Sequence, residues 1–232
     1  MLISVCLTLN LIQTSNLLNS KAMTTTLLLG THNNAKIARY QKFLMIPNLE
    51  LIVIKDLPNY DKIPNILESG NSELENAQIK AKAYYDFFKI PTISEDSGFY
   101  IEGLEDNMQP RKDVKGIAGV TDEFDSQTTF DLMTNYYINV ADQFGGQVPA
   151  YFLDTYSIYD GVNFYNATAK RHLTLTNQIN GVDLGFPIAS LYLVNQKPYH
   201  SLSDLEMGIM LKPSLDAMNK TIKDFLSDYK KL

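Results

Sequence analysis

Apolar and polar positions alternate along the N-terminal half of the chain in a way that predicts strands and helices in turn. Residues 24–30, TTTLLLG, are a short apolar run that ends in glycine, and they predict a buried strand. Residues 31–44 carry apolar side chains at helical spacing, and residues 49–54, LELIVI, predict a second strand. A strand, a helix and a strand in this order form a βαβ unit, which favours an α/β fold.

A longer helix is predicted over residues 68–89. Gly70 interrupts the segment near its start, and Ser72 with Glu75 three residues later has the form of a capping box. One arc of the helical wheel is apolar and holds Leu74, Ala77, Ala81, Tyr84, Tyr85 and Phe88. The opposite arc holds Glu75, Asn76, Ile79 and Lys80.

The rest of the chain predicts a strand, a loop, a hairpin and further helices. Residues 91–94, PTIS, form a strand that is expected to stop at Glu95 and Asp96, and residues 105–127 are polar and predict a loop. The remaining predicted elements are a helix over residues 129–144, a hairpin over residues 148–176 that turns at Asp160 and Gly161, and two closing helices separated by Pro213.

We expect residues 23–232 to form a single domain, because no clear linker, repeat or low-complexity tract interrupts them. Residues 1–22 are apolar at their start, but no basic residue precedes the apolar run and polar residues break it. This segment is too short and interrupted to span a bilayer and is a poor signal peptide. We expect a disordered or loosely packed extension, with Met23 as an alternative start.

Charge and cysteine content narrow the class of protein. The net charge is −6, with 20 basic and 26 acidic residues, which argues against a nucleic-acid-coating surface. No run is long enough to cross a membrane. The single cysteine, Cys6, excludes an intrachain disulfide and favours a reducing, cytoplasmic compartment.

The adjacent acids Glu95 and Asp96 require a nearby positive charge, because like charges repel. The loop THNNAK opens a predicted helix, where free N–H groups attract anions, and Lys36 adds a full charge. These acids and lysines lie near the ends of predicted elements in one α/β layer, and together they are able to bind a metal-bound polyphosphate. The carboxylates would hold Mg²⁺, and the lysines would neutralise the phosphate oxygens. The candidates are Glu75, Glu95, Asp96, Lys36 and Lys80.

Each candidate also has a purely structural interpretation. Glu75 completes the capping box by reaching back to the backbone N–H of Ser72. The lysines and Glu95 are then simply solvated, and Asp96 stabilises the turn that follows it.

Three ordered motifs resemble the inosine triphosphate pyrophosphatase family. They are THNNAK at residues 31–36, ESGNSELENAQIKA at residues 68–81 and ISEDSG at residues 93–98. The resemblance implies an elongated mixed β-sheet with flanking helices, two lobes and a central cleft. It implies Mg²⁺-dependent hydrolysis of nucleoside triphosphates to monophosphate and pyrophosphate, with a preference for deaminated purines. It also implies a homodimer.

The resemblance further implies a role for each matching residue. Glu75 and Asp96 hold Mg²⁺, and Asp96, beside Glu95, is the general base. The residues implied to bind the substrate phosphates are Thr31, Asn33, Lys36, Lys80, Ser97 and Gly98.

The chain departs from the family pattern mainly in the base-reading half. His32 replaces a glycine, Arg39 stands where glutamate is usual, and the late Ser-His-Arg is absent. Phe186 lies in LGFP, residues 184–187, which lacks the aspartate usual in the family. It either stacks on a base or is a core aromatic residue. Lys212 either replaces lost basic residues in part or is solvated.

Three hypotheses follow from these residues. The first is a nucleotide pyrophosphatase with relaxed base choice, in which the preference for inosine over adenosine triphosphate is on the order of tenfold or less because few edge-specific hydrogen bonds remain. The second is a catalytically impaired nucleotide-binding or protein-interaction relative. The third is a phosphohydrolase for a pyrimidine or modified nucleotide.

Overall fold

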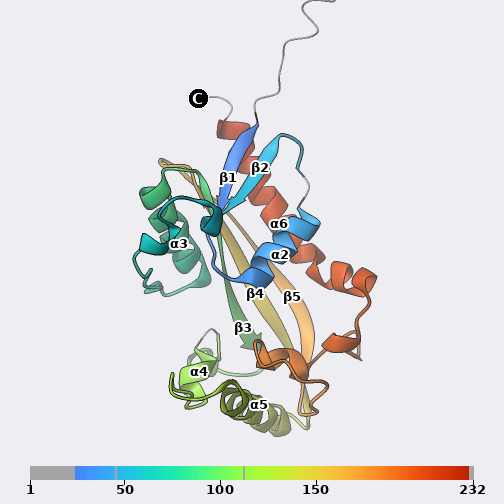
Figure 1. Cartoon of the computed structure of the whole chain (residues 1–232). Helices are drawn as coiled ribbons and strands as arrows, with labels where there is room; N and C mark the ends of the chain where they lie inside the picture. Colours follow the sequence, from blue (N-terminus) through green and yellow to red (C-terminus); the bar gives the residue numbers. More distant parts are fainter. Residues whose placement is uncertain (1–23, 45, 112, 230–232) are drawn as a thin grey trace, which may run out of the picture.

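The computed structural model describes residues 24–44, 46–111 and 113–229, and its centre is a seven-stranded mixed sheet (Figure 1). The strand order is β2-β1-β3-β4-β5-β6-β7, with parallel pairing on both sides of β1 and antiparallel pairing from β3 onward. The predictions for residues 1–22, Cys6 and Met23 lie outside the described residues. The strands are β1 (Thr25–Leu29), β2 (Leu49–Val53), β3 (Thr92–Ile101), β4 (Gln147–Tyr159), β5 (Phe164–Thr176), β6 (Tyr192–Val194) and β7 (Lys197–Pro198).

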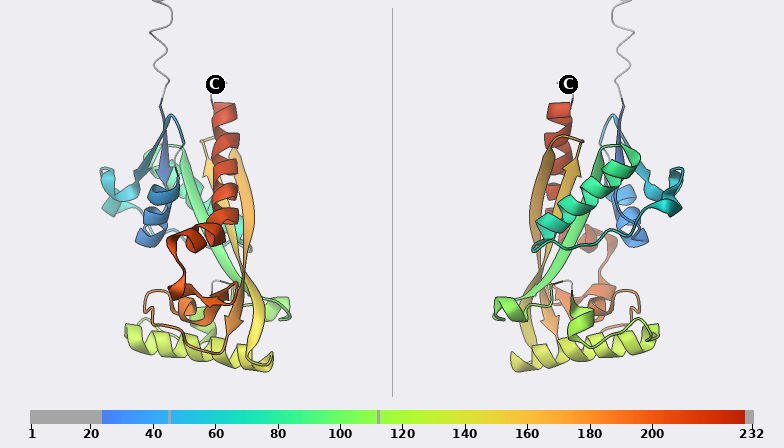
Figure 2. Two further views of the ribbon diagram at one scale, coloured as in Figure 1. Left: turned by 90° about the vertical axis from the view of Figure 1, so that its right-hand side faces the viewer. Right: turned by 90° about the vertical axis from the view of Figure 1, so that its left-hand side faces the viewer.

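Helices cover both faces of this sheet. Helix α3 packs on one face against β3 and β4, and α2 and α6 cover the opposite face, with α5 at the other end of the long strands (Figure 2). The helices are α2 (Asn34–Phe43), α3 (Glu73–Phe88), α4 (Val114–Ile117), α5 (Ser126–Gln143) and α6 (Asp204–Tyr229). Short 3₁₀ turns are η1 (Ile54–Asp56), η2 (Tyr60–Lys62), η3 (Asp106–Met108), η4 (Pro187–Leu191) and η5 (Tyr199–Ser201).

Two hydrophobic clusters lie at the two ends of β3, β4 and β5. One joins α2 and α6 to the sheet and includes the fully buried Tyr156, Met218 and Phe225. The other surrounds α5 and includes Phe99 and Tyr137. The α/β class and the mixed sheet with flanking helices are therefore confirmed, whereas the central cleft and the division into one two-lobed domain stay predictions.

Strand β3 differs from its prediction in length. It does not stop at Glu95 but continues to Ile101, because each of its residues pairs with β4 in an antiparallel ladder. The polar residues Ser94, Glu95 and Asp96 therefore lie within a paired strand, where they are buried, and do not mark its end.

Helices differ from prediction in three places. The predicted loop over residues 105–127 contains α4, and α5 already begins at Ser126, capped by Asp125. The two closing helices are one helix that continues through Pro213. Beyond this proline Met218, Ile222 and Phe225 are buried, and their burial offsets the hydrogen bond that proline cannot donate.

Helix α3 buries a polar residue that the helical wheel placed on the outer arc. Asn76 is 1% exposed, while Leu74 is 38% exposed. The Asn76 side chain accepts from the Gly70 N–H at 2.8 Å and donates to the Gly70 carbonyl at 3.4 Å. These contacts satisfy the buried amide and hold the chain entering α3.

Candidate active site

The candidate site lies where β1 ends beside β3. Strand β1 pairs with β3 only as far as Ile93, and the chain then turns through Gly30 into the loop that opens α2. A Cβ on Gly30 would lie 2.3 Å from Ser94 Oγ, so only glycine fits this approach. The THNNAK loop and the residues after Ser94 are thereby held next to each other.

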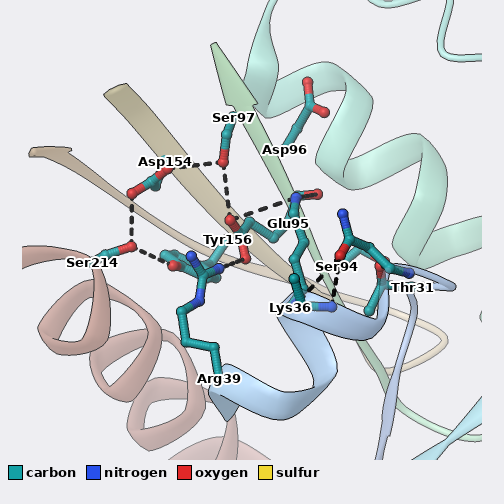
Figure 3. Close-up of polar contacts among 12 residues, drawn as sticks. Thr31, Lys36, Arg39, Ser94, Glu95, Asp96, Ser97, Asp154, Tyr156 and Ser214 are labelled. Atoms are coloured by element: carbon teal, nitrogen blue, oxygen red, sulfur yellow. Dashed lines mark hydrogen bonds and ion pairs between the residues drawn. The ribbon is translucent and has the colours of Figure 1, made fainter. Parts of the chain in front are cut away.

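Glu95 and Asp96 point to opposite faces of the sheet, because successive strand residues alternate (Figure 3). Glu95 faces α2, where Arg39 Nη2 lies 2.5 Å and Lys36 Nζ lies 3.5 Å from its carboxylate oxygens. Asp96 points toward α3, with Lys80 Nζ 2.8 Å from Oδ1. The expectation that one divalent cation neutralises both acids is wrong, since each acid has its own cationic side chains on its own face.

Glu95 is held ionised despite its burial. Burial opposes the charge, but Lys36 and Arg39 outweigh it, and together they keep the pKa of Glu95 below its usual value. Burial likewise disfavours the charged guanidinium of Arg39, but Glu95 raises its pKa above the ordinary value. This pair stays charged across the physiological range, so Glu95 is poorly suited to accept a proton.

A buried polar network extends from Glu95 across three strands to α6. Ser97 Oγ lies 2.9 Å from Glu95 Oε1 and 2.8 Å from Asp154 Oδ1, so it links the two acids. Asp154 also accepts from Arg171 Nε at 2.5 Å and from Ser214 Oγ at 2.7 Å. Burial opposes ionisation of Asp154, but Arg171 holds its pKa below the ordinary value. The network ties β3, β4, β5 and α6 together behind the site.

The opposite face gathers two carboxylates around one lysine. Lys80 Nζ contacts Asp96 at 2.8 Å and Glu68 Oε2 at 3.3 Å. Next to them, Gly98 leaves room for the buried Glu73, whose Oε1 would lie 2.2 Å from a Cβ on Gly98. Gly98 therefore has a packing role here.

Thr31 and Asn33 shape the loop rather than pointing into open space. Asn33 Oδ1 caps α2 by accepting from the N–H groups of Ala35 at 2.9 Å and Lys36 at 3.2 Å. Thr31 Oγ1 accepts from the Asn33 N–H at 3.1 Å. An anion at this helix start competes with the Asn33 carbonyl for the same donors.

Glu75 behaves as a capping residue with a changed partner. Ser72 Oγ accepts from the Glu75 N–H at 3.2 Å, which confirms one half of the capping box. The Glu75 carboxylate accepts from the Asn71 N–H at 2.6 Å, not from Ser72 as expected. Glu75 lines a different hollow from the one that contains Lys80.

The acidic side chains around Lys80 are suited to a divalent cation that keeps several water ligands, rather than to one coordinated by protein side chains alone. Within the described ranges, no group of three or more His, Cys, Asp or Glu side chains is arranged to hold a metal. Glu68 and Asp96 nevertheless converge on the same ammonium group. Mg²⁺ typically keeps several waters and takes one or two carboxylates plus substrate phosphates, and this pair meets that requirement.

The candidate base-binding residues lie elsewhere. The Phe186 ring is 42% exposed and packs on Phe152 at 6.0 Å between centroids. Lys212 pairs with Asp216 at 2.5 Å on the exposed side of α6. Neither residue lines the hollow beside Lys80.

Comparison with known proteins identifies the family. The sequence model of the Ham1 family matches residues 27–153, which make up more than half of the chain. The chain belongs to the Ham1 family. Its three sequence motifs all fall in the matched segment, and the relatives below confirm the resemblance to inosine triphosphate pyrophosphatases.

Sequence similarity to curated Ham1 relatives is confined to part of their length. A dITP/XTP pyrophosphatase of Leptospira interrogans is 38% identical over 81 residues, which cover 34% of this chain and 39% of the relative. The same coverage holds for a dITP/XTP pyrophosphatase of Oceanobacillus iheyensis, which is 33% identical over 79 residues. The aligned segment thus spans well under half of each relative.

The fold similarity extends further than the sequence similarity. The Ham1 protein of Staphylococcus aureus has a TM-score of 0.65 at 17% identity and covers 88% of this chain and 100% of that protein. A structural match at 17% identity shows the fold alone. It extends the Ham1 fold to the region of the chain outside the three motifs. None of the helices in the described part of the chain has the length and apolar character needed to cross a lipid bilayer.

Proposed function

We propose that this protein is a nucleoside triphosphate pyrophosphatase that acts on inosine- or xanthosine-type nucleotides and releases pyrophosphate with the help of Mg²⁺. The observation that carries the proposal is the convergence of Asp96 and Glu68 on Lys80, at the end of β1. Similarity to dITP/XTP pyrophosphatases over the matched segment supports it.

Lys36 and Lys80 bind the substrate phosphates in this proposal. They reach the end of β1 from opposite faces of β3, and an incoming polyphosphate draws them partly away from the carboxylates. Thr31, Asn33, Ser97 and Gly98 support phosphate binding by fixing the loop and strand. Glu95 acts through Lys36 and Arg39 as a positioning residue, because it is buried and paired with both cations.

Asp96 and Glu68 hold the cation, and Glu75 stays a further candidate ligand. When bound, Mg²⁺ supplies charge neutralisation at the phosphate oxygens. Asp96 accepts a proton from the attacking water as the water oxygen bonds to the α-phosphorus. The bond from the α-phosphorus to the bridging oxygen breaks, and pyrophosphate leaves.

A second candidate is a phosphohydrolase for a pyrimidine or modified nucleotide, which rests on the absence of the family's late Ser-His-Arg and is not favoured by the similarity to dITP/XTP pyrophosphatases. A panel of nucleoside triphosphates assayed for pyrophosphate release separates the two. Relaxed base choice with roles for Phe186 and Lys212, a homodimer and a cytoplasmic location remain predictions alongside either candidate.

A further inference from the structure

Glu95 of β3 contacts two cationic side chains of α2, and the two contacts are unequal (Figure 3). Arg39 Nη2 lies 2.5 Å from Glu95 Oε2 in a short, charge-assisted contact. Lys36 Nζ lies 3.5 Å from Oε1 and 3.5 Å from the Glu95 carbonyl oxygen, outside the range of about 2.7–3.2 Å for ordinary N–H···O hydrogen bonds. Ser97 Oγ lies closer to Oε1, at 2.9 Å. Arg39 is therefore the tighter partner of this carboxylate, and Lys36 is the looser one.

The two cations lie at different places along α2. Lys36 belongs to the first turn of the helix, beside the THNNAK loop, and its side chain is 24% exposed. Arg39 follows three residues later on the same side of the helix, and its side chain is 18% exposed. Lys36 is thus the nearer of the two to the loop that the proposed function assigns to the substrate phosphates.

A buried carboxylate needs a counter-charge throughout substrate binding. The side chain of Glu95 is 2% exposed. If Lys36 moves to a phosphate oxygen, Arg39 stays with Glu95 and keeps it neutralised. Without Arg39 the same movement leaves Glu95 with no cation in contact among the described residues, and an unpaired buried charge is strongly unfavourable.

The identity of residue 39 sets this chain apart from the family pattern. Arg39 stands where a glutamate is usual, so the charge at this position has the opposite sign. A glutamate here would add a negative charge close to Glu95. Arg39 Nε is buried and has no hydrogen-bond partner among the described residues, so Arg39 and Glu95 do not form a two-bond fork. The contact depends on the charge of Arg39 more than on the shape of its guanidinium.

We propose that Arg39 is a positioning residue of the phosphate site: it neutralises Glu95, so that Lys36 is free to leave this carboxylate and bind a substrate phosphate. The inference rests on the proposed function, because it takes Lys36 as a phosphate ligand. Arg39 itself does not contact the substrate, and the exchange breaks no covalent bond.

The test measures binding of pyrophosphate with Mg²⁺ by isothermal titration calorimetry. The proteins are the wild type, Arg39→Gln, Glu95→Gln and the double variant that carries both substitutions. Arg39→Gln should weaken binding about tenfold, the scale of one charge-assisted hydrogen bond, because Lys36 then stays with Glu95. In the Glu95→Gln background the same substitution should have no effect, since no carboxylate is left to neutralise.

Two single variants separate this role from a loss of structure. Arg39→Lys keeps the charge and should restore most of the affinity for pyrophosphate. Arg111→Gln removes an exposed arginine that pairs with Asp106, and it should leave the affinity unchanged. The thermal midpoint of each variant is the control for folding.

A measurement on the wild type needs no variant to fold. Side-chain ¹⁵N NMR follows the Lys36 Nζ and Arg39 Nε resonances while pyrophosphate and Mg²⁺ are added. The Lys36 resonance should shift and that of Arg39 should stay nearly in place. A shift of Arg39 as large as that of Lys36 would mean that Arg39 binds the phosphate directly, and an unchanged Lys36 would mean that no exchange takes place. Either result overturns the inference.

Failure of this inference is distinct from failure of the proposed function. If the wild type releases no pyrophosphate from any nucleoside triphosphate, the proposed function fails, but the binding data still test the role of Arg39. The inference is overturned if Arg39→Gln weakens pyrophosphate binding equally with and without Glu95, if it has no effect in either background, or if the wild type does not bind pyrophosphate.

Discussion

Arg39 of α2 and Glu95 of β3 form a buried ion pair, with the guanidinium Nη2 2.5 Å from the carboxylate. The side chain of Glu95 is 2% exposed, and Lys36 approaches it from the same helix at 3.5 Å. The pair attaches α2, and with it the THNNAK loop, to the strand that carries Asp96. Its cationic partners explain how an ionised acid is held next to Asp96.

Removing the charge of Glu95 should destabilise the fold. Glu95→Gln leaves Arg39 and Lys36 without their buried counter-charge, and breaking one side of a buried pair typically costs about 3–5 kcal/mol. Urea unfolding monitored by circular dichroism measures the loss. Asp86→Asn, which breaks the exposed Lys82–Asp86 pair, is the control and should leave the midpoint nearly unchanged. Equal effects of the two substitutions would contradict a structural role for Glu95.

Asp96→Asn should abolish turnover and leave the fold intact. The amide keeps the size of the side chain but neither accepts a proton well nor holds a cation, and general-base catalysis is typically worth about 10² to 10⁴ in rate. Lys80 retains Glu68 as a partner in this variant. The measurement is kcat for pyrophosphate release, with the thermal midpoint as a control for folding. Activity near that of the wild type would remove Asp96 from the catalytic role.

The two candidate metal ligands outside β3 are distinguished by paired substitutions. Glu68→Gln should raise the Mg²⁺ concentration needed for half-maximal activity at least tenfold, because it removes one of the two carboxylates that contact Lys80 among the described residues. Glu75→Gln should leave that requirement unchanged, since glutamine still accepts from the Asn71 N–H. The reverse pattern of Mg²⁺ dependence would assign the metal to Glu75.

Acid should weaken the fold through two buried carboxylates. The folded-state pKa values of Glu95 and Asp154 are depressed by Lys36 and Arg39 and by Arg171 against the opposing effect of burial. A depressed folded pKa stabilises the protein above the unfolded value, about 4, and this contribution is lost as pH falls through the folded value. The free energy of unfolding should therefore fall steadily below about pH 4. A constant or rising stability on acidification would contradict this account.

Much of the scaffold follows from local sequence pattern. The apolar spacing of α2 and α3 and the Ser72 cap are local signals, and the structure contains both helices. The length of β3 was not predictable in this way, because EDSG is polar at every position except the glycine. Its continuation depends on pairing with β4, which is far away in the sequence.

The residues that pair with the candidate acids are harder to predict from the sequence than the helices and strands. Arg39 had a usable signal, because it follows Lys36 by three residues and lies on the same side of α2. Asp154 lies within the predicted hairpin, where nothing in the local sequence distinguishes it from a solvated charge. Glu68 begins the second motif, but its contact with Lys80 depends on how the loop before α3 folds back, which the local pattern does not show.

Identification of the products formed from inosine triphosphate by the wild-type protein with Mg²⁺ tests the central claim most directly. Phosphorus NMR distinguishes cleavage at the α-phosphorus from cleavage at the γ-phosphorus. The account predicts inosine monophosphate and pyrophosphate in equal amounts, with no diphosphate intermediate. Formation of inosine diphosphate and inorganic phosphate, or no reaction with any nucleoside triphosphate, would contradict it.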